Sequence, residues 1–221
     1  MGFFRTLFGG IGRALGSVDE ELLATGLAGR GELVSFEPTS TTVTIGNGFE
    51  ERVCQIGLRV LLDHREPYEV SVRQRVPEIF IPRLTQQGVV AVRVDPADPT
   101  RVALDLNAPI PEVTLTRRTG PGSAAWILEH GTPLEVVLVQ AEPMGVKDAD
   151  EHEVFRLKLT VLGPGDPIQV EVGNAVPAAA LPLLYPGARL HARRGDAPEQ
   201  IVVDFARGLA GPAGAPGSAS A

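Results

Sequence analysis

The sequence predicts an all-β protein built from two tandem copies of one module. Residues 67–106 recur at residues 167–205, so most of the 221-residue chain belongs to a duplicated unit. Short segments in both copies alternate apolar and polar residues, which is the period of a half-exposed strand. Pro, Gly and Asp lie between these segments and are typical of tight turns. These observations favour antiparallel sheets over a parallel α/β arrangement.

The repeat is defined by identical residues at a constant spacing. At a spacing of 100 the identical pairs are Pro67/Pro167, Val70/Val170, Val72/Val172, Val76/Val176, Pro77/Pro177, Pro82/Pro182 and Leu84/Leu184. After a one-residue deletion the spacing becomes 99, and the pairs are Gly88/Gly187, Pro99/Pro198 and Asp105/Asp204. Because the inward-facing positions share one pattern, we expect the two copies to superpose.

The repeat and the composition of its flanks divide the chain into five parts. We predict an N-terminal helical segment at 1–26, a first module at 27–107, a linker at 108–126, a second module at 127–207 and a disordered tail at 208–221. Within the first part, Ser17 begins a capping box for a short helix that Gly26 ends.

Each module contains five predicted strands. They span 31–37, 53–62, 68–76, 89–94 and 101–106 in the first copy, and 134–142, 154–162, 168–176, 188–193 and 200–205 in the second. A crossing segment separates the third strand from the fourth. Five short strands are best stabilised by closing into a small barrel of the OB or SH3-like kind, because closure removes exposed edges. An open sandwich is the alternative.

Composition narrows the function classes. The net charge of −7 argues against a general affinity for nucleic acid, which needs an excess of Lys and Arg. Cys54 is the only cysteine, so the chain forms no internal disulfide and fits a reducing compartment; an alternating apolar stretch around it predicts a buried thiol. No apolar run reaches the ~20 residues that cross a bilayer. We therefore expect a cytoplasmic protein, with attachment to a membrane surface as the alternative.

The repeated element ends with Val-Arg-Val-Asp-Pro-Ala-Asp-Pro at 92–99 and Val-Ala-Leu-Asp at 102–105. In this it resembles small β-barrel modules of uncharacterised, often membrane-associated actinobacterial proteins. The resemblance covers both copies, although Arg194-Gly195-Asp196-Ala197-Pro198 replaces the first Asp-Pro pair in the second. It implies a fold and no reaction, because that family offers no catalytic residues to carry over.

The titratable residues do not form a recognisable catalytic pattern. The acidic run Asp148, Asp150, Glu151, His152 and Glu153 matches no calcium-binding loop, and we interpret it as a solvated hairpin turn. Asp95, Asp98 and Asp105 are interpreted as turn and strand-edge residues. We therefore predict a non-enzymatic protein without metal or cofactor.

Two groups of residues are candidates for binding. Arg59, Arg73 and Arg75 are predicted to project from neighbouring strands and to form a ligand face, as in a nucleic-acid-binding OB-like protein. The second copy has Glu171, Gly173 and Ala175 at the positions equivalent to the face on its third strand.

The other candidate is the apolar N-terminal stripe, Phe3, Phe4, Leu7, Phe8 and Ile11. A helix with this stripe can pack on its own barrel, dock on a protein partner or a second copy, or lie on a membrane surface. The leading hypothesis is an interaction or assembly protein that docks through this helix, with nucleic acid an unlikely partner.

Overall fold

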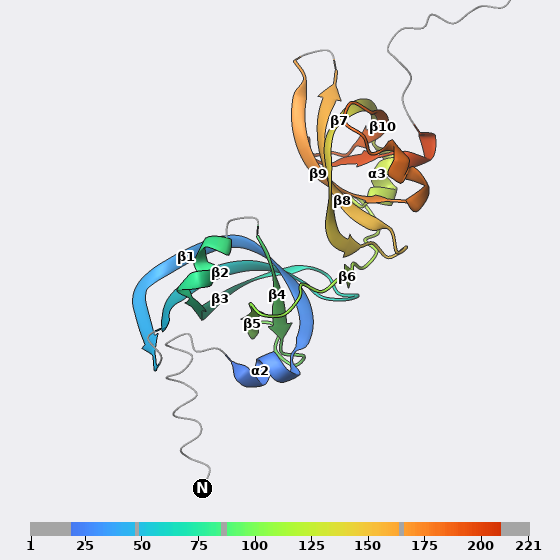
Figure 1. Cartoon of the computed structure of the whole chain (residues 1–221). Helices are drawn as coiled ribbons and strands as arrows, with labels where there is room; N and C mark the ends of the chain where they lie inside the picture. Colours follow the sequence, from blue (N-terminus) through green and yellow to red (C-terminus); the bar gives the residue numbers. More distant parts are fainter. Residues whose placement is uncertain (1–18, 47–48, 85–87, 164–165, 209–221) are drawn as a thin grey trace, which may run out of the picture. The chain divides into compact units, whose positions relative to one another are not determined.

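The structure is a computed structural model that describes residues 19–46, 49–84, 88–163 and 166–208. It is mostly β, as the sequence predicts, with two antiparallel sheets and a few short helices (Figure 1). The chain divides into two compact units, Met1–Leu115 and Thr116–Ala221.

The described part of the first unit opens with a short helix and continues as a five-stranded sheet. Its elements are α2 (Glu20–Thr25), β1 (Leu27–Ile45), β2 (Phe49–Leu61), β3 (Tyr68–Pro77), the 3₁₀ helix η1 (Glu78–Arg83), β4 (Val89–Val94), β5 (Val102–Asp105) and β6 (Val113–Thr114). The strands lie in the order β3-β2-β1-β4-β5, and each pair of neighbours is antiparallel. The long strand β1 therefore pairs with β2 along most of its length and with β4 at its start.

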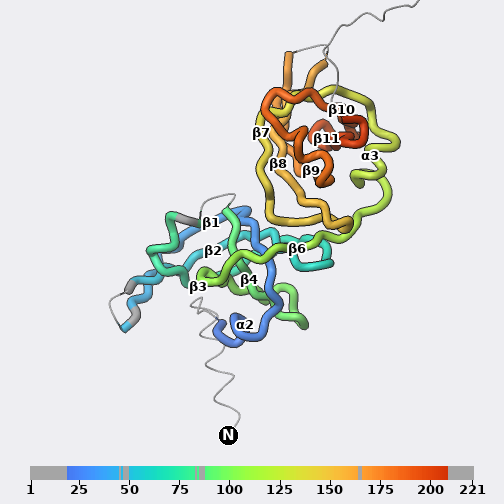
Figure 2. Tube along the Cα trace, turned by 45° about the vertical axis from the view of Figure 1, so that its right-hand side comes forward, coloured from blue at the N-terminus to red at the C-terminus, as the bar shows by residue number. Residues whose placement is uncertain are grey.

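The second unit repeats this plan from its helix to its fifth strand, but its described residues lack a counterpart of β6 and add a short 3₁₀ helix at their end (Figure 2). Its elements are α3 (Ala124–His130), β7 (Thr132–Lys147), β8 (Glu153–Leu162), β9 (Ile168–Val176), η2 (Ala178–Leu183), β10 (Arg189–Arg194), β11 (Ile201–Val203) and η3 (Phe205–Arg207). The order β11-β10-β7-β8-β9 is that of the first sheet, read from the other end.

The duplication extends further toward the N-terminus of each copy than sequence identity revealed. Helix α3 lies partly within residues 108–126, which were predicted to be a linker. Like α2, it ends at a glycine whose N–H bonds the fourth residue back, Gly26 to Leu22 and Gly131 to Ile127. A Cβ at either glycine would lie 2.6 Å from that carbonyl oxygen, so both positions require glycine.

The start of the first helix differs from the prediction. Asp19 is its N-cap, because its Oδ1 accepts a hydrogen bond from the N–H of Leu22 at 3.1 Å. The predicted cap, Ser17, lies outside the described residues. Asp and Ser are about equally good caps, so the sequence pattern alone did not separate them.

The long first strand of each unit carries two irregularities at matching positions. In β1 the register shifts between Leu33 and Ser35 and again after Pro38. In β7 it shifts between Leu138 and Gln140 and again after Pro143. All of these positions are 105 residues apart, so the bulges belong to the shared framework. Each bulge bends its strand and lets one strand serve two parts of the sheet.

The one-residue deletion lies later than the sequence comparison placed it. The carbonyl of Gly88 accepts a hydrogen bond from Leu33, and the carbonyl of Ala188 accepts one from Leu138. Gly88 is therefore equivalent to Ala188, and its match to Gly187 is wrong. The turn from β4 to β5 closes between Asp95 and Arg101, whereas the turn from β10 to β11 closes between Gly195 and Gln200. The missing residue belongs to this turn, where a change of length does not disturb the sheet.

Aliphatic side chains fill the interior of each unit. Cys54 is fully buried, as predicted, and burial raises the pKa of its thiol. The largest fully buried side chains include Ile56, Leu58, Leu104, Leu138, Leu157, Leu159 and Leu190.

A buried amide joins the two outer strands of each sheet. In the first unit, Nε2 of Gln74 on β3 donates to the carbonyl of Leu104 on β5 at 3.0 Å, and the N–H of Leu104 donates to Oε1 of Gln74 at 2.8 Å. In the second unit, Asn174 on β9 donates to the carbonyl of Ile201 at 3.3 Å and accepts from the N–H of Val203 at 2.8 Å. Both side chains are nearly inaccessible, at 4% and 5% exposed. We refer to each of these contacts as an amide clasp.

The amide clasps provide hydrogen-bond partners for buried backbone groups of the outer strands. Because each neighbouring pair of strands is antiparallel, β3 and β5 run in the same direction at opposite ends of the sheet. The backbone groups of Leu104 that face away from β4 would be buried without a partner. A carboxamide carries one acceptor and two donors, so a single side chain replaces the missing strand at this position.

The amide clasps generate a stability prediction. Gln74→Ala is expected to lower the free energy of unfolding of the first unit by roughly 1–3 kcal/mol, because it leaves the N–H and C=O of Leu104 buried and unpaired. Asn174→Ala is expected to do the same in the second unit. Denaturant titrations resolve the units, because labelling of the only cysteine, Cys54, reports on the first and fluorescence of the only tryptophan, Trp126, on the second.

Gln55→Ala is the matched control for Gln74→Ala, since the amide of Gln55 on β2 makes an exposed bond to Ser71 on β3, the strand that also carries Gln74. Equal losses in the two variants would contradict the role assigned to the amide clasp.

Candidate functional site

The three predicted arginines lie on β2 and β3. Arg59 and Arg73 are exposed, and the side chain of Arg75 is 24% exposed. Arg59 stands in register between Glu32 on β1 and Glu69 on β3. Residues directly opposite one another share a face of the sheet, so Arg59 is flanked by two carboxylates.

The other two arginines also have carboxylates near them. Arg73 is in register with Gln55, and Gln55 in turn with Glu37 on β1. Nε of Arg75 lies 3.8 Å from a carboxylate oxygen of Glu51. The predicted ligand face therefore carries alternating charges and is not a contiguous basic surface. This weakens the electrostatic attraction that binding to a phosphate backbone needs.

The second unit places its charges differently on the corresponding strands. Its cations are on β8, where Arg156 lies 3.3 Å from Glu171 on β9 and Lys158 stands in register with the same glutamate. Sequence analysis did not single out Arg156 or Lys158, because it compared only the third strands of the two copies. The outward charges thus differ between two units that share a framework.

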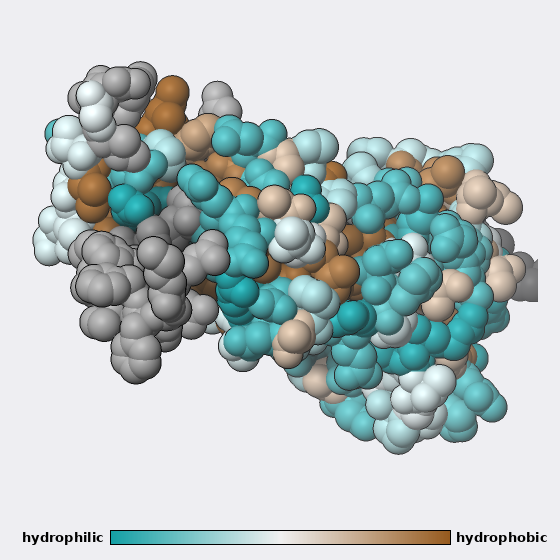
Figure 3. Space-filling view, turned by 90° about the horizontal axis from the view of Figure 1, so that it is seen from below, coloured by the Kyte–Doolittle hydropathy of each residue, from teal (hydrophilic) through white to brown (hydrophobic). Residues whose placement is uncertain are grey.

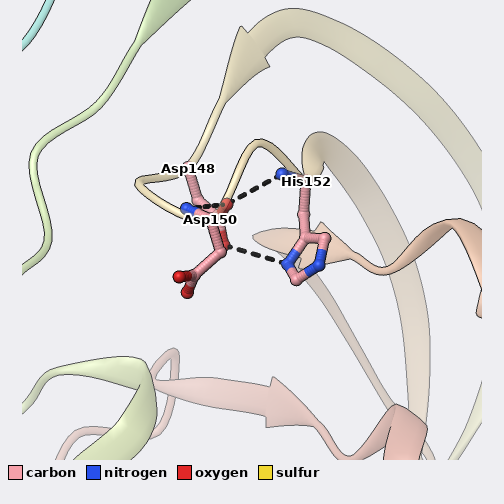
Figure 4. A group of neighbouring side chains, drawn as sticks. All are labelled: Asp148, Asp150 and His152. Atoms are coloured by element: carbon pink, nitrogen blue, oxygen red, sulfur yellow. Dashed lines mark hydrogen bonds and ion pairs between the residues drawn. The ribbon is translucent and has the colours of Figure 1, made fainter.

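The acidic run forms the turn between β7 and β8, as predicted (Figure 4). Oδ1 of Asp148 accepts hydrogen bonds from the N–H groups of Asp150 and His152, both at 2.9 Å. Oδ2 of Asp148 lies 3.5 Å from Nδ1 of His152. Glu151 adopts a φ of 63°, which the turn requires between these bonds.

This turn brings potential cation ligands together. One ligand atom from each of Asp148, Asp150 and His152 lies within 4.8 Å of the others. However, Asp150 forms an ion pair with Arg117, and Asp148 already accepts two backbone hydrogen bonds. These contacts account for the arrangement as a self-capped turn, in agreement with the interpretation from the sequence.

An ionic cluster ties α2 to the turn between β4 and β5. Arg101 donates through Nε to Asp19 at 2.9 Å and through Nη1 to Asp95 at 2.8 Å. The N–H of Ala97, and then Arg101, hold the pKa of Asp95 below its ordinary value. Hydrogen bonds from Thr100 lower the pKa of Asp98 in the same turn. Both aspartates are turn residues, as the sequence predicts.

The N-terminal docking residues Phe3, Phe4, Leu7, Phe8 and Ile11 lie outside the described residues. The description begins at Asp19, the residue that Arg101 anchors. On the described surface, Ile79 is 75% exposed, Ile168 is 63% exposed and Val34 is 53% exposed. On the face seen in Figure 3, apolar residues form separate patches among hydrophilic ones. In the described part of the chain, no helix has the length and apolar character needed to cross a bilayer.

No protein-family model matches the sequence, and no curated protein matches it significantly. The resemblance to actinobacterial β-barrel modules thus rests on the repeated motif, and the function has to be argued from the geometry.

The ionic cluster predicts a specific pH dependence. The pKa of Asp95 in the folded chain lies below the value of about 3.9 for an unfolded chain. Ionised Asp95 therefore stabilises the first unit above about pH 4, and this contribution is lost as the pH falls through the folded pKa. Asp95→Asn is expected to reduce the loss of stability between about pH 5 and about pH 3, measured by denaturant titration with Cys54 labelling.

Glu66→Gln, which removes an exposed carboxyl of the same unit, serves as the control. If both variants keep the acid sensitivity of the parent protein, the assignment to Asp95 is wrong.

Proposed function

We propose that the chain is a non-catalytic interaction or assembly protein made of two OB-like barrels. The strand order supports the OB assignment, because a long first strand pairs with both the second and the fourth strands. A short helix also crosses between the third and fourth strands of each unit. The OB-fold is a five-stranded, partly open Greek-key barrel, and the amide clasps fit a barrel of which the last seam is not closed by backbone pairing.

The main support for an interaction role is the contrast between the interiors and the surfaces of the two copies. The two copies share their glycine helix ends, bulges and amide clasps, whereas the charges on their outer faces differ. A common framework with different surfaces supports two binding modules with different contacts.

The proposed docking element is the apolar stripe of Phe3, Phe4, Leu7, Phe8 and Ile11. Burying one large apolar side chain is worth roughly 1.5–3 kcal/mol, so a stripe of this kind favours any surface that covers it. The ion pair between Arg101 and Asp19 holds the described residue that follows this segment in the sequence. A second copy or another protein is the proposed cover, and self-association is the form that can be tested directly.

The docking role predicts the effect of a truncation. Deleting residues 1–16 is expected to leave the melting temperatures of both units unchanged, because α2 has its own cap at Asp19. It is also expected to convert a concentration-dependent oligomer into a monomer, as measured by light scattering. A full-length control with Arg5→Gln and Arg13→Gln keeps the apolar stripe and should still associate.

Two results would contradict this proposal. A truncation that lowers the melting temperature without changing association would place the segment on its own unit. A full-length protein that is monomeric and floats with anionic vesicles, with flotation lost in the double-arginine control, would point to a membrane surface.

Binding of nucleic acid is the second candidate, because Arg73 projects from the β2–β3 face on which OB-folds bind oligonucleotides. The carboxylates of Glu32, Glu37 and Glu69, which stand in register across the sheet with Arg59 or with Arg73, argue against binding of nucleic acid. We expect a fluorescent single-stranded oligonucleotide to show no saturable change in anisotropy at low salt. Saturable binding that is lost in Arg73→Ala and retained in Arg156→Ala would establish the second candidate instead.

A further inference from the structure

The two amide clasps differ in geometry. Gln74 bonds the N–H and the C=O of one residue, Leu104, at 2.8 and 3.0 Å. Asn174 is one methylene shorter and reaches two residues, with its longer bond of 3.3 Å to Ile201. The outer strand of the second unit is thus held less closely by its amide.

The strands that receive the amide clasps also differ in their support. The ladders are similar: β5 pairs with β4 over four register positions, and β11 pairs with β10 over three, followed by a bond from the N–H of Asp204 to the carbonyl of His191 at 2.9 Å. The turn before β5 is additionally held by Arg101, which bonds both Asp19 and Asp95, and by the hydroxyl of Tyr68, which donates to the carbonyl of Pro99 at 2.9 Å. The equivalent positions in the second unit are Gln200 and Ile168. Neither side chain can form these ionic or hydroxyl contacts.

The segments that follow the two strands differ as well. After β5, the chain is tied back to the first unit, because the N–H of Thr114 donates to Asp63 and its carbonyl accepts from His64. After β11, the described chain continues only through η3, whose Phe205 packs partly buried on the core. β11 is anchored by its amide clasp, by its ladder with β10, and by the buried side chains of Ile201 and Val203, but the residues described after it add no contact like that of Thr114.

We infer that β11 and η3 form a latch, which leaves the sheet as one unit while the rest of the second module stays folded. The first module has no such freedom at β5, because the ionic cluster and the Tyr68 bond hold the equivalent strand. When the latch is open, the backbone of β10 has an unpaired edge of the kind to which an extended peptide adds as a strand. The second module thus contains a latch that the first module lacks, although the two modules share a fold.

Native-state hydrogen exchange on the full-length protein tests this inference. The N–H of Val203 is expected to exchange at least about tenfold faster than that of Leu138 in the same unit, and its rate is expected to depend less steeply on denaturant, because the opening exposes less surface than global unfolding does. The N–H of Leu104 is expected to exchange at the rate of Leu33, through global unfolding of the first unit. If Val203 shares the rate and denaturant dependence of Leu138, there is no latch.

A variant of the first unit tests the cause of the difference. Arg101→Gln together with Tyr68→Phe removes the additional contacts and should accelerate exchange at Leu104 about tenfold while leaving Leu33 unchanged. Arg59→Gln, which replaces an exposed arginine of the same unit, should change neither amide. Unchanged exchange at Leu104 in the double variant would overturn the explanation based on these contacts.

Discussion

The amide clasp is the interaction on which the arrangement of each unit depends. A five-stranded sheet of this order ends in two strands that run in the same direction and do not pair through their backbones. Gln74 and Asn174 supply a donor and an acceptor at that point, where an unpaired buried group would cost on the order of 1–3 kcal/mol. The bulges of β1 and β7 bend the long strands, and this curvature is what brings the outer strands within reach of one side chain.

The repeat and its alternating pattern were sufficient to predict a β-rich chain and five strands in each copy. They did not reveal Gln74 and Asn174, because these are different residues and a search for identity passes over them. They also misplaced the deletion, since Gly88 and Gly187 are identical only by coincidence. Helix α3 was missed although Gly131 resembles Gly26, because the identity between the copies is weak in that segment. For the binding face, the sequence predicted exposed Arg59 and Arg73, but only the register shows the glutamates beside them.

The proposed function follows from the contrast between framework and surface. Gly26 and Gly131 end their helices in the same way, yet Arg75 and Arg156 occupy different strands of their units. The ion pair of Arg101 with Asp19 adds a contact to the first unit that the second unit does not have at Gln200. The first copy thus has contacts near its last strand that the second copy lacks at the equivalent positions.

The carboxamide protons of Gln74 and Asn174 test the central claim most directly. If each amide closes a sheet from the interior, its NH₂ protons should exchange with solvent much more slowly than those of Gln140, which bonds Glu142 on the surface. Proton-exchange NMR on selectively labelled protein measures all three groups in one sample. Slow exchange at Gln74 and Asn174 is the predicted result. Exchange as fast as that of Gln140 would contradict closure by these two side chains.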